Sequence, residues 1–331
     1  MKTLFMFPGQ GSQYIGMAKD FYQEFASARI VFEEASDSSG LNLKKLCFDS
    51  DEETLKKTEI TQPALLTSSI AIWKSLCERF PFDLQNSVFA GHSLGEYSAL
   101  VAMGALPLAS AAKIVHHRGL YMQNAVPAGL GGMSALVFKP KSDWAALSTE
   151  LCAQVRDEFA KRGDKLSLMP ANFNSPEQIV ISGHKKALLR AKEMVEANDS
   201  WCVRKVVELP VSAPFHSSLM LPAQEKLLPE LMAAPWKATS LQYIANTTAK
   251  AHTAENGSEI AMRLADQISM SVRWVGSVQF AISQNVLRAV EVGPKAVLQG
   301  LCARISFEEK KLETFGISTL EEMKTYESKY V

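Results

Sequence analysis

The segment GHSLG, residues 91–95, holds the side chain of this sequence that is best placed for covalent chemistry. The apolar run Val88–Ala90 precedes it directly, and helix-forming residues follow it. A Gly-x-Ser-x-Gly segment between a strand and a helix is typical of a sharp turn that exposes the serine hydroxyl. The N-terminus of the following helix would favour negative charge beside that hydroxyl. The pattern therefore predicts that Ser93 is a nucleophile, and the alternative is a serine in an ordinary surface turn.

A serine nucleophile needs a base near neutral pH, and histidine is the usual one. The chain has six histidines, of which His92 adjoins the serine and should point away from it, so we interpret His92 as structural. His216 follows the segment 210–215, whose two prolines exclude regular helix. A histidine in such a loop could reach across a cleft, which makes His216 the candidate base. No acid stands out as the third member of a triad, and a backbone carbonyl could orient the imidazole instead.

Arg118 lies in a helical pattern that runs from Pro107 to Val126, on the same face as Ile114 and Met122. A guanidinium on an apolar stripe must find an anion or bear a desolvation penalty. That anion could be an internal carboxylate or the carboxylate of a ligand. The alternative is an arginine that extends its charged end into water.

The loop FPGQGSQ, residues 7–13, follows the first apolar run of the chain. Its two glycines allow backbone amides to come close to a ligand. The loop could therefore complete an oxyanion hole, or it could be only a tight turn.

Alternation of strand-like and helical segments indicates the elements that position these residues. The strand-like runs are Thr3–Phe7, Val88–Ala90, Leu241–Ala245 and Val286–Val292. The helical patterns include Pro63–Phe80, Pro107–Val126 and Ser258–Ser269. This alternation predicts an α/β fold with a mostly parallel sheet.

The pattern changes between residues 130 and 208, where six segments follow in the order βαββαβ. They are Gly132–Phe138, Ser142–Arg162, Lys165–Phe173, Gln178–Ser182, His184–Ala197 and Cys202–Leu209. This order is ferredoxin-like. We therefore expect an inserted subdomain at 130–208 and a larger core made of 1–129 and 209–331. A cleft between the two would be a usual place for a ligand.

Composition limits the classes of partner. Lys plus Arg and Asp plus Glu both number 35, so the formal net charge is zero, and we expect neither nucleic acid nor a membrane as a partner. The five cysteines show no Cys-x-x-Cys spacing, which predicts reduced core thiols. The longest uncharged run, 119–138, is broken by a proline and glycines and cannot form a membrane-spanning helix. The expected location is the cytoplasm.

Several ordered motifs resemble one known family. They are FPGQGSQ (7–13), TQPAL (61–65), GHSLGEYSAL (91–100), RGLYMQ (118–123), NFNSPEQIVISG (172–183), VSAPFHS (211–217) and EVGP (291–294). Over roughly residues 3–305 the chain resembles the malonyl-CoA:acyl-carrier-protein transacylases, including the free-standing acyltransferases of polyketide synthesis. The resemblance implies a hydrolase-like α/β core with a ferredoxin-like insert, in agreement with the pattern above.

The resemblance also implies roles for the residues that perform the chemistry. Ser93 would be the acylated nucleophile and His216 its base. The main-chain carbonyl of Gln267 would accept a hydrogen bond from His216, which would explain the missing acid. The N–H groups of Gln10 and Leu94 would form the oxyanion hole.

Further residues would select the acyl group. Arg118 would bind the malonyl carboxylate through a bidentate pair. Gln62 and Met122 would line the pocket, and Asn172 would border the cleft. The resemblance also implies a preference for malonyl over methylmalonyl, because Phe215 would fill the space of a methyl group.

The implied activity is transfer of malonyl from malonyl-CoA to the phosphopantetheine thiol of acyl carrier protein, for fatty-acid synthesis. Alternatives are loading of polyketide-synthase carriers, an editing hydrolase of the same fold, and a catalytically silent carrier-docking module. No metal or bound cofactor is expected, since the sequence has neither a His-Glu-x-x-His motif nor a Cys/His cluster. We expect a monomer. Basic residues of the second insert helix are candidates for docking the carrier: Lys185, Lys186, Arg190 and Lys192.

Overall fold

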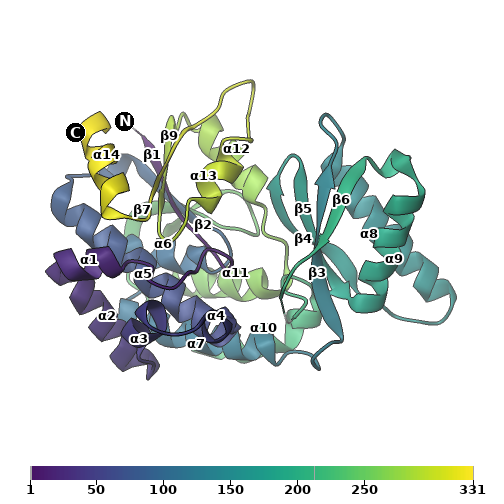
Figure 1. Ribbon diagram of the computed structural model, residues 1–331, viewed down its shortest axis with the longest axis horizontal. Coiled ribbons are helices and arrows are strands. Elements are labelled where there is room, and N and C mark those ends of the chain that lie inside the picture. Colours follow the sequence, from purple (N-terminus) through teal and green to yellow (C-terminus); the bar gives the residue numbers. More distant parts are fainter. Residues whose placement is uncertain (1, 212, 331) are drawn as a thin grey trace.

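Two β-sheets with helices packed on them make up the computed structural model, which describes residues 2–211 and 213–330 (Figure 1). The larger sheet has the strand order β10-β9-β1-β2-β7-β8. Its strands are β1 (Thr3–Phe7), β2 (Ser87–Gly91), β7 (Thr239–Ile244), β8 (Ala251–Ala254), β9 (Arg288–Val292) and β10 (Glu313–Ile317). The pairings are parallel except for β8, which runs antiparallel to β7 at one edge. The predicted mostly parallel sheet is therefore confirmed.

Both faces of the larger sheet are buried, because successive residues of each strand point to opposite faces. Phe5 and Phe7 of β1 pack into one core, whereas Leu4 and Met6 pack into another. Helices α12 (Trp274–Ser283) and α13 (Val297–Cys302) cover the second face. The remaining helices of this part are α1 (Lys19–Glu24), α2 (Ala26–Ser39), α3 (Leu43–Phe48), α4 (Glu52–Lys56), α5 (Thr58–Arg79), α6 (Gly95–Ala102), α7 (Leu108–Gln123), α10 (Leu221–Met232), α11 (Gly257–Ser269) and α14 (Leu320–Tyr330).

Helix α5 begins at Thr58, five residues before the predicted start at Pro63. A proline inside a helix cannot donate a hydrogen bond to the carbonyl four residues earlier, which here is that of Glu59. The ring of His116, on the neighbouring α7, donates to that carbonyl from Nδ1 at 2.9 Å. The unpaired acceptor is thus satisfied from another helix, and α5 continues through Pro63.

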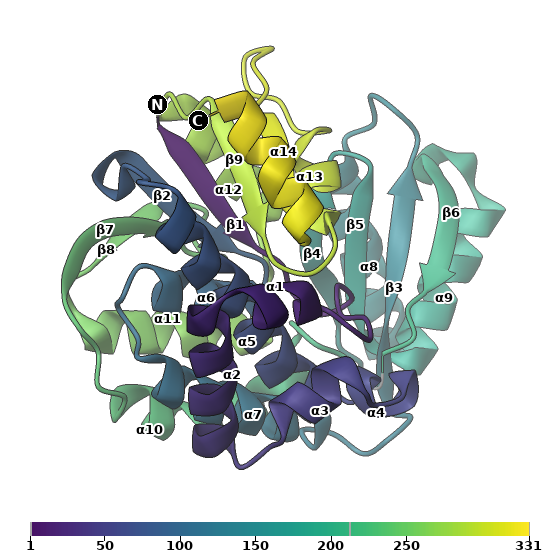
Figure 2. The same cartoon turned by 60° about the vertical axis from the view of Figure 1, so that its left-hand side comes forward.

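The smaller sheet is antiparallel and has the order β4-β5-β3-β6. Its strands are β3 (Gly131–Phe138), β4 (Leu168–Ser175), β5 (Gln178–His184) and β6 (Val203–Glu208), with α8 (Trp144–Lys161) after β3 and α9 (Lys185–Ala197) after β5. The predicted βαββαβ order is therefore present. Helices α8 and α9 cover one face of this sheet, as Figure 2 shows. Residues of the other face, such as Met133 and Val180, join the core of the larger part. Short 3₁₀ turns lie at Leu84–Asn86, Asp199–Trp201 and Ser218–Met220.

The cysteines are free thiols, as predicted, but they are not all in the core. Cys47, Cys152 and Cys302 are buried, whereas Cys77 is exposed and Cys202 is partly exposed. Within residues 2–211 and 213–330, no helix has the length and apolar character that a membrane span requires. The same residues contain no group of three or more His, Cys, Asp or Glu side chains arranged to hold a metal ion.

Candidate active site

The turn between β2 and α6 presents Ser93 in a left-handed backbone conformation, with φ of 51°. The two flanking glycines are required by close contacts across this turn. A Cβ atom on Gly91 would lie 1.9 Å from the carbonyl carbon and oxygen of Gly95, and one on Gly95 would lie 2.0 Å from the carbonyl oxygen of Phe7. The Gly-x-Ser-x-Gly spacing therefore reflects the tight packing of the turn against β1.

Ser93 and His216 lie within hydrogen-bond distance although 123 residues separate them in sequence. The distance from Ser93 Oγ to His216 Nε2 is 2.8 Å, and that from His216 Nδ1 to the carbonyl oxygen of Gln267 is also 2.8 Å. Because a carbonyl oxygen can only accept, Nδ1 carries the proton of the neutral ring. Nε2 is then free to accept the proton of the serine hydroxyl. The backbone carbonyl fills the position that an acid holds in other triads.

Burial governs the protonation of His216, which is 4% exposed. Burial is the largest cause that lowers the pKa of His216, and the nearby positive charge of Arg118 lowers it further, to about 3. The hydrogen bond to the Gln267 carbonyl acts in the opposite direction. The imidazole is therefore neutral, and able to accept a proton, at ordinary pH.

Arg118 of α7 is 1% exposed and points toward the serine. Its guanidinium donates to Gln62 Oε1 at 2.7 Å, to Gln267 Oε1 at 2.8 Å and to Ser93 Oγ at 3.1 Å. Among the described residues no carboxylate lies within 4.0 Å of this group, and Nε has no hydrogen-bond partner. Of the two anions considered from the sequence, the internal carboxylate is thus not found. The guanidinium is left available to an anionic ligand.

A cavity of about 170 Å³ joins these groups. It is lined by Gln10, Gln62, His92, Ser93, Leu94, Arg118, Met122, Met133, Asn172, Asn174, Val180, Leu209, Val211, Phe215 and His216. Every predicted catalytic or substrate-binding residue lines this cavity except Gln267. Gln267 lies behind the lining and accepts hydrogen bonds from two lining residues, His216 and Arg118. A second cavity of about 430 Å³ shares Gln10, Leu209 and Val211 with it.

Gln10 and Leu94, the residues predicted to supply the oxyanion hole, both line the cavity. Leu94 is the N-cap residue of α6, and Gln10 lies in the loop after β1. The N–H of Ser93 itself is already used, because it donates to Asn246 Oδ1 at 2.7 Å. His92, the other histidine of the turn, contacts Asn174 Oδ1 through Nε2 at 2.8 Å instead of Ser93.

Two buried polar residues next to the turn were not predicted from the sequence. Asn246 donates from Nδ2 to the carbonyl of Gly91 at 2.6 Å and accepts from Ser93, so it spans the turn. Glu96 accepts hydrogen bonds from Gln267 and from the Asn246 backbone. In the sequence, Glu96 cannot be distinguished from an ordinary acid in the first turn of a helix, so no signal pointed to it. The signal for Asn246 was its position after a strand, since parallel strands end at the same edge of a sheet.

The basic residues predicted to dock a carrier are partly neutralised. Arg190 pairs with Glu158 of α8 at 2.8 Å and with Glu193 at 3.2 Å. Lys192 pairs with Glu196 at 3.8 Å. Of the four basic residues predicted to dock a carrier, Lys185 and Lys186 are therefore the two that remain candidates.

Comparison with known proteins identifies the family. The model of the acyl transferase domain matches residues 4–314. The chain belongs to the acyl transferase family. A relative named malonyl CoA-acyl carrier protein transacylase in Bacillus subtilis is 39% identical over 317 residues, which cover 96% of this chain and 93% of that protein. A relative of the same name in Escherichia coli is 40% identical and covers 91% of this chain and 92% of that protein.

Solved structures of other family members agree. An acyl carrier protein S-malonyltransferase from Vibrio cholerae superposes with a TM-score of 0.87 at 36% identity, covering 98% of this chain and 99% of that one. A malonyl-transacylase in complex with its type II PKS acyl-carrier protein gives a TM-score of 0.88 at 34% identity and 98% coverage of both chains. Acyl transferases of this fold are thus similar to the chain over almost its whole length.

The buried environment of His216 leads to a prediction about its titration. We expect its ring to stay neutral between about pH 5 and pH 8, because burial and Arg118 both oppose protonation. Nitrogen chemical shifts of the ring, assigned by comparison with His216→Gln, measure this directly. A titration midpoint near the ordinary histidine value of about 6.5 would contradict the prediction.

Proposed function

We propose that this acyl transferase moves the malonyl group from malonyl-CoA to the phosphopantetheine thiol of an acyl carrier protein, and so supplies fatty-acid synthesis. One observation carries the proposal: the buried guanidinium of Arg118 has only neutral acceptors and lies 3.1 Å from Ser93 Oγ. A cation in this position suits an acyl group that ends in a carboxylate. The names of the relatives from Bacillus subtilis and Escherichia coli support the same activity.

The first half-reaction forms an acyl-enzyme. His216 Nε2 takes the proton of Ser93 as Oγ attacks the thioester carbonyl. The N–H groups of Gln10 and Leu94 donate to the oxyanion, and loss of one such donor typically costs about 3–4 kcal/mol of transition-state stabilisation. The carbon–sulfur bond then breaks, and His216 returns its proton to the thiolate of CoA.

The second half-reaction reverses these steps with another thiol. The phosphopantetheine thiol of the carrier enters the cavity, and His216 takes its proton as the sulfur attacks the acyl-serine. The oxyanion collapses, the bond to Ser93 Oγ breaks, and the serine regains its proton from His216. Ping-pong kinetics follow from the covalent intermediate.

The substrate carboxylate would also act on the base. The charge of Arg118 is the second-largest cause of the low pKa of His216. A malonyl carboxylate bound to Arg118 would offset that charge, so the pKa of His216 would rise when the correct acyl group is in place. The developing oxyanion would act in the same direction. A carboxylate-bearing substrate thus both binds the site and strengthens its base.

The lining of the cavity supports a preference for malonyl over methylmalonyl. Phe215 and Met122 are 6% and 2% exposed, and both side chains line the cavity beside His216 and Arg118. A methyl group on the substrate would have to displace one of these packed side chains. Asn172 and Gln62 are polar residues that line the same cavity.

The arrangement of the chain fits this role. We propose that residues 1–129 and 209–331 form the catalytic core, that 130–208 form a subdomain which closes the cleft, and that the protein is a cytoplasmic monomer. A polyketide carrier is the second candidate acceptor, since one similar structure is a malonyl-transacylase with its type II PKS carrier.

A mass measurement tests the proposed transfer. With malonyl-CoA alone, we expect malonyl-enzyme to accumulate on Ser93, because the cavity holds the ester through Arg118 and Phe215. Added holo carrier protein should remove the malonyl group and become malonylated. Ser93→Ala should show neither species. Rapid release of free malonate with or without carrier would instead indicate an editing hydrolase.

Replacement of Arg118 tests substrate selection. In Arg118→Ala we expect kcat/KM for malonyl transfer to fall by a factor of about 100 or more, since loss of one partner from a buried charge pair costs about 3–5 kcal/mol. Acetyl transfer should persist or improve, which also shows that the variant folds. The matched control is Arg79→Ala, which removes an exposed arginine paired with Glu327. Equal losses for malonyl and acetyl would remove Arg118 from the recognition role.

A further inference from the structure

A buried carboxylate behind the nucleophile takes part in no step of the reaction described above. Glu96, on the first turn of α6, is 1% exposed. Its Oε2 accepts from Gln267 Nε2 at 2.7 Å and from the backbone N–H of Asn246 at 3.1 Å. Burial raises the pKa of Glu96 to about 7, against these two hydrogen bonds and the charges of two arginines. Burial of a carboxyl group costs free energy, which the interactions that Glu96 provides must offset.

Glu96 determines which way the side-chain amide of Gln267 faces. The Nε2 group of Gln267 donates to Glu96 and to the carbonyl of Ser93 at 2.9 Å, which leaves Oε1 to accept from Arg118. If the amide were turned over, its NH₂ would face the guanidinium donors and its oxygen would face the carboxylate. The contact with Arg118 would be repulsive in either charge state of Glu96, because Arg can only donate. The contact with Glu96 would be repulsive when its carboxyl is ionised, because a carboxylate can only accept.

The same carboxylate supports the residue that spans the nucleophile turn. Asn246 follows β7, and its backbone N–H bonds to Glu96 while its side chain bonds to Ser93 N–H and to the Gly91 carbonyl. Glu96 is therefore linked by hydrogen bonds to two parts of the site. Asn246 links it to the turn that carries Ser93, and Gln267 links it to Arg118.

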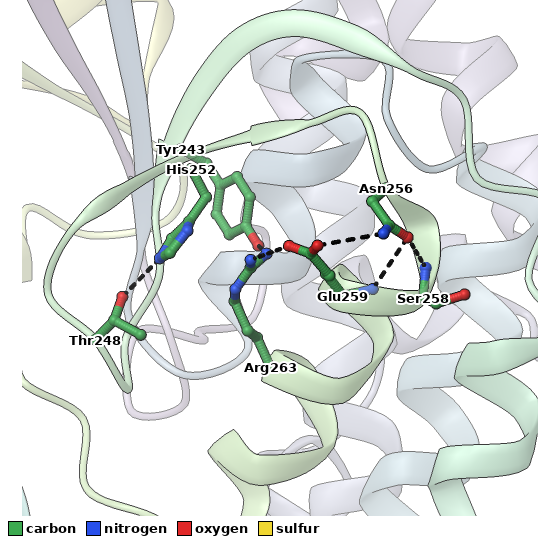
Figure 3. Close-up of polar contacts among 7 residues, drawn as sticks. All are labelled: Tyr243, Thr248, His252, Asn256, Ser258, Glu259 and Arg263. Carbon is green, nitrogen blue, oxygen red and sulfur yellow. Dashed lines mark hydrogen bonds and ion pairs between the residues drawn. The ribbon is translucent and has the colours of Figure 1, made fainter.

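Glu96 also balances charge without occupying Arg118. Within the described part of the chain, neither Arg118 nor Arg263 approaches Glu96 as an ion pair, although both favour its ionised form. Figure 3 shows Arg263, one turn before Gln267 on α11, bonded instead to Glu259 at 2.6 Å and to the Tyr243 hydroxyl at 3.4 Å. A carboxylate placed directly on Arg118 would compete with a substrate carboxylate. The amide of Gln267 keeps the two charges apart.

We propose that Glu96 is a positioning residue for the acyl transfer: it fixes the amide of Gln267, so that a neutral oxygen holds Arg118 beside Ser93 and leaves its charge to the acyl carboxylate. Glu96 touches no reacting atom and acts through Gln267 and Asn246. The proposal rests on the recognition role of Arg118 proposed above. It assigns part of the preference for a carboxylate-bearing acyl group to a residue outside the cavity lining.

The test compares kcat/KM for malonyl-CoA and acetyl-CoA in Glu96→Gln and Glu96→Ala. A glutamine oxygen can accept the same two N–H groups, so Glu96→Gln should keep the malonyl-to-acetyl ratio within about threefold of the unaltered enzyme. Glu96→Ala leaves both donors unpaired and frees the Gln267 amide to turn. Its ratio should fall by a factor of about 10 to 100, the size expected for a lost hydrogen bond to a charged group.

Controls separate this proposal from its alternatives. Glu259→Ala removes an exposed carboxylate that bonds to Arg263, and it should leave the ratio unchanged. If Glu96→Ala does not fold, Glu96→Asp replaces it, because the shorter side chain withdraws the same oxygen and should also lower the ratio. An unchanged ratio in these variants, or parallel losses of malonyl and acetyl transfer, would overturn the proposal. If Arg118→Ala also keeps the ratio, the recognition role of Arg118 fails instead.

Discussion

The buried guanidinium of Arg118 is the constraint on which the site depends. A cation at 1% exposure must be held by acceptors, and here they are the amide oxygens of Gln62 and Gln267 and the hydroxyl of Ser93. Neutral acceptors hold the group in place without cancelling its charge. Helices α5, α7 and α11, which carry Gln62, Arg118 and Gln267, must therefore meet the nucleophile turn at one point. The adjacent strands β1, β2 and β7 of the larger sheet end at that point.

The fold was predictable where burial leaves a periodic pattern. Four strands of the larger sheet, β1, β2, β7 and β9, and the βαββαβ segment were located from apolar runs and turn residues, since a buried parallel strand is apolar on both faces. The two edge strands, β8 and β10, were not predicted. The start of α5 was wrong, because the carbonyl left unpaired by Pro63 is satisfied by His116, which lies far away in sequence. Local preferences cannot report a partner of this kind. The ion pair between Arg190 of α9 and Glu158 of α8 was missed for the same reason, because the two residues are distant in sequence.

The site was predictable to the extent that its groups are side chains with a distinctive position. Ser93 and His216 were found from a turn pattern and from a proline-rich loop. Gln10 and Leu94 were suggested only by the resemblance to a family, because a backbone N–H or carbonyl has no residue type to reveal it. Glu96 and Asn246 were not found, since their importance lies in what they contact and not in their chemistry alone.

The structure of the malonyl-enzyme tests the central claim most directly. Crystals of the chain reacted with malonyl-CoA in the absence of carrier protein would show the acyl group on Ser93 Oγ. The account predicts that its carboxylate accepts two hydrogen bonds from Arg118, with His216 still bonded to the Gln267 carbonyl. A carboxylate that points to solvent, while Arg118 keeps only its bonds to Gln62 and Gln267, would contradict the account.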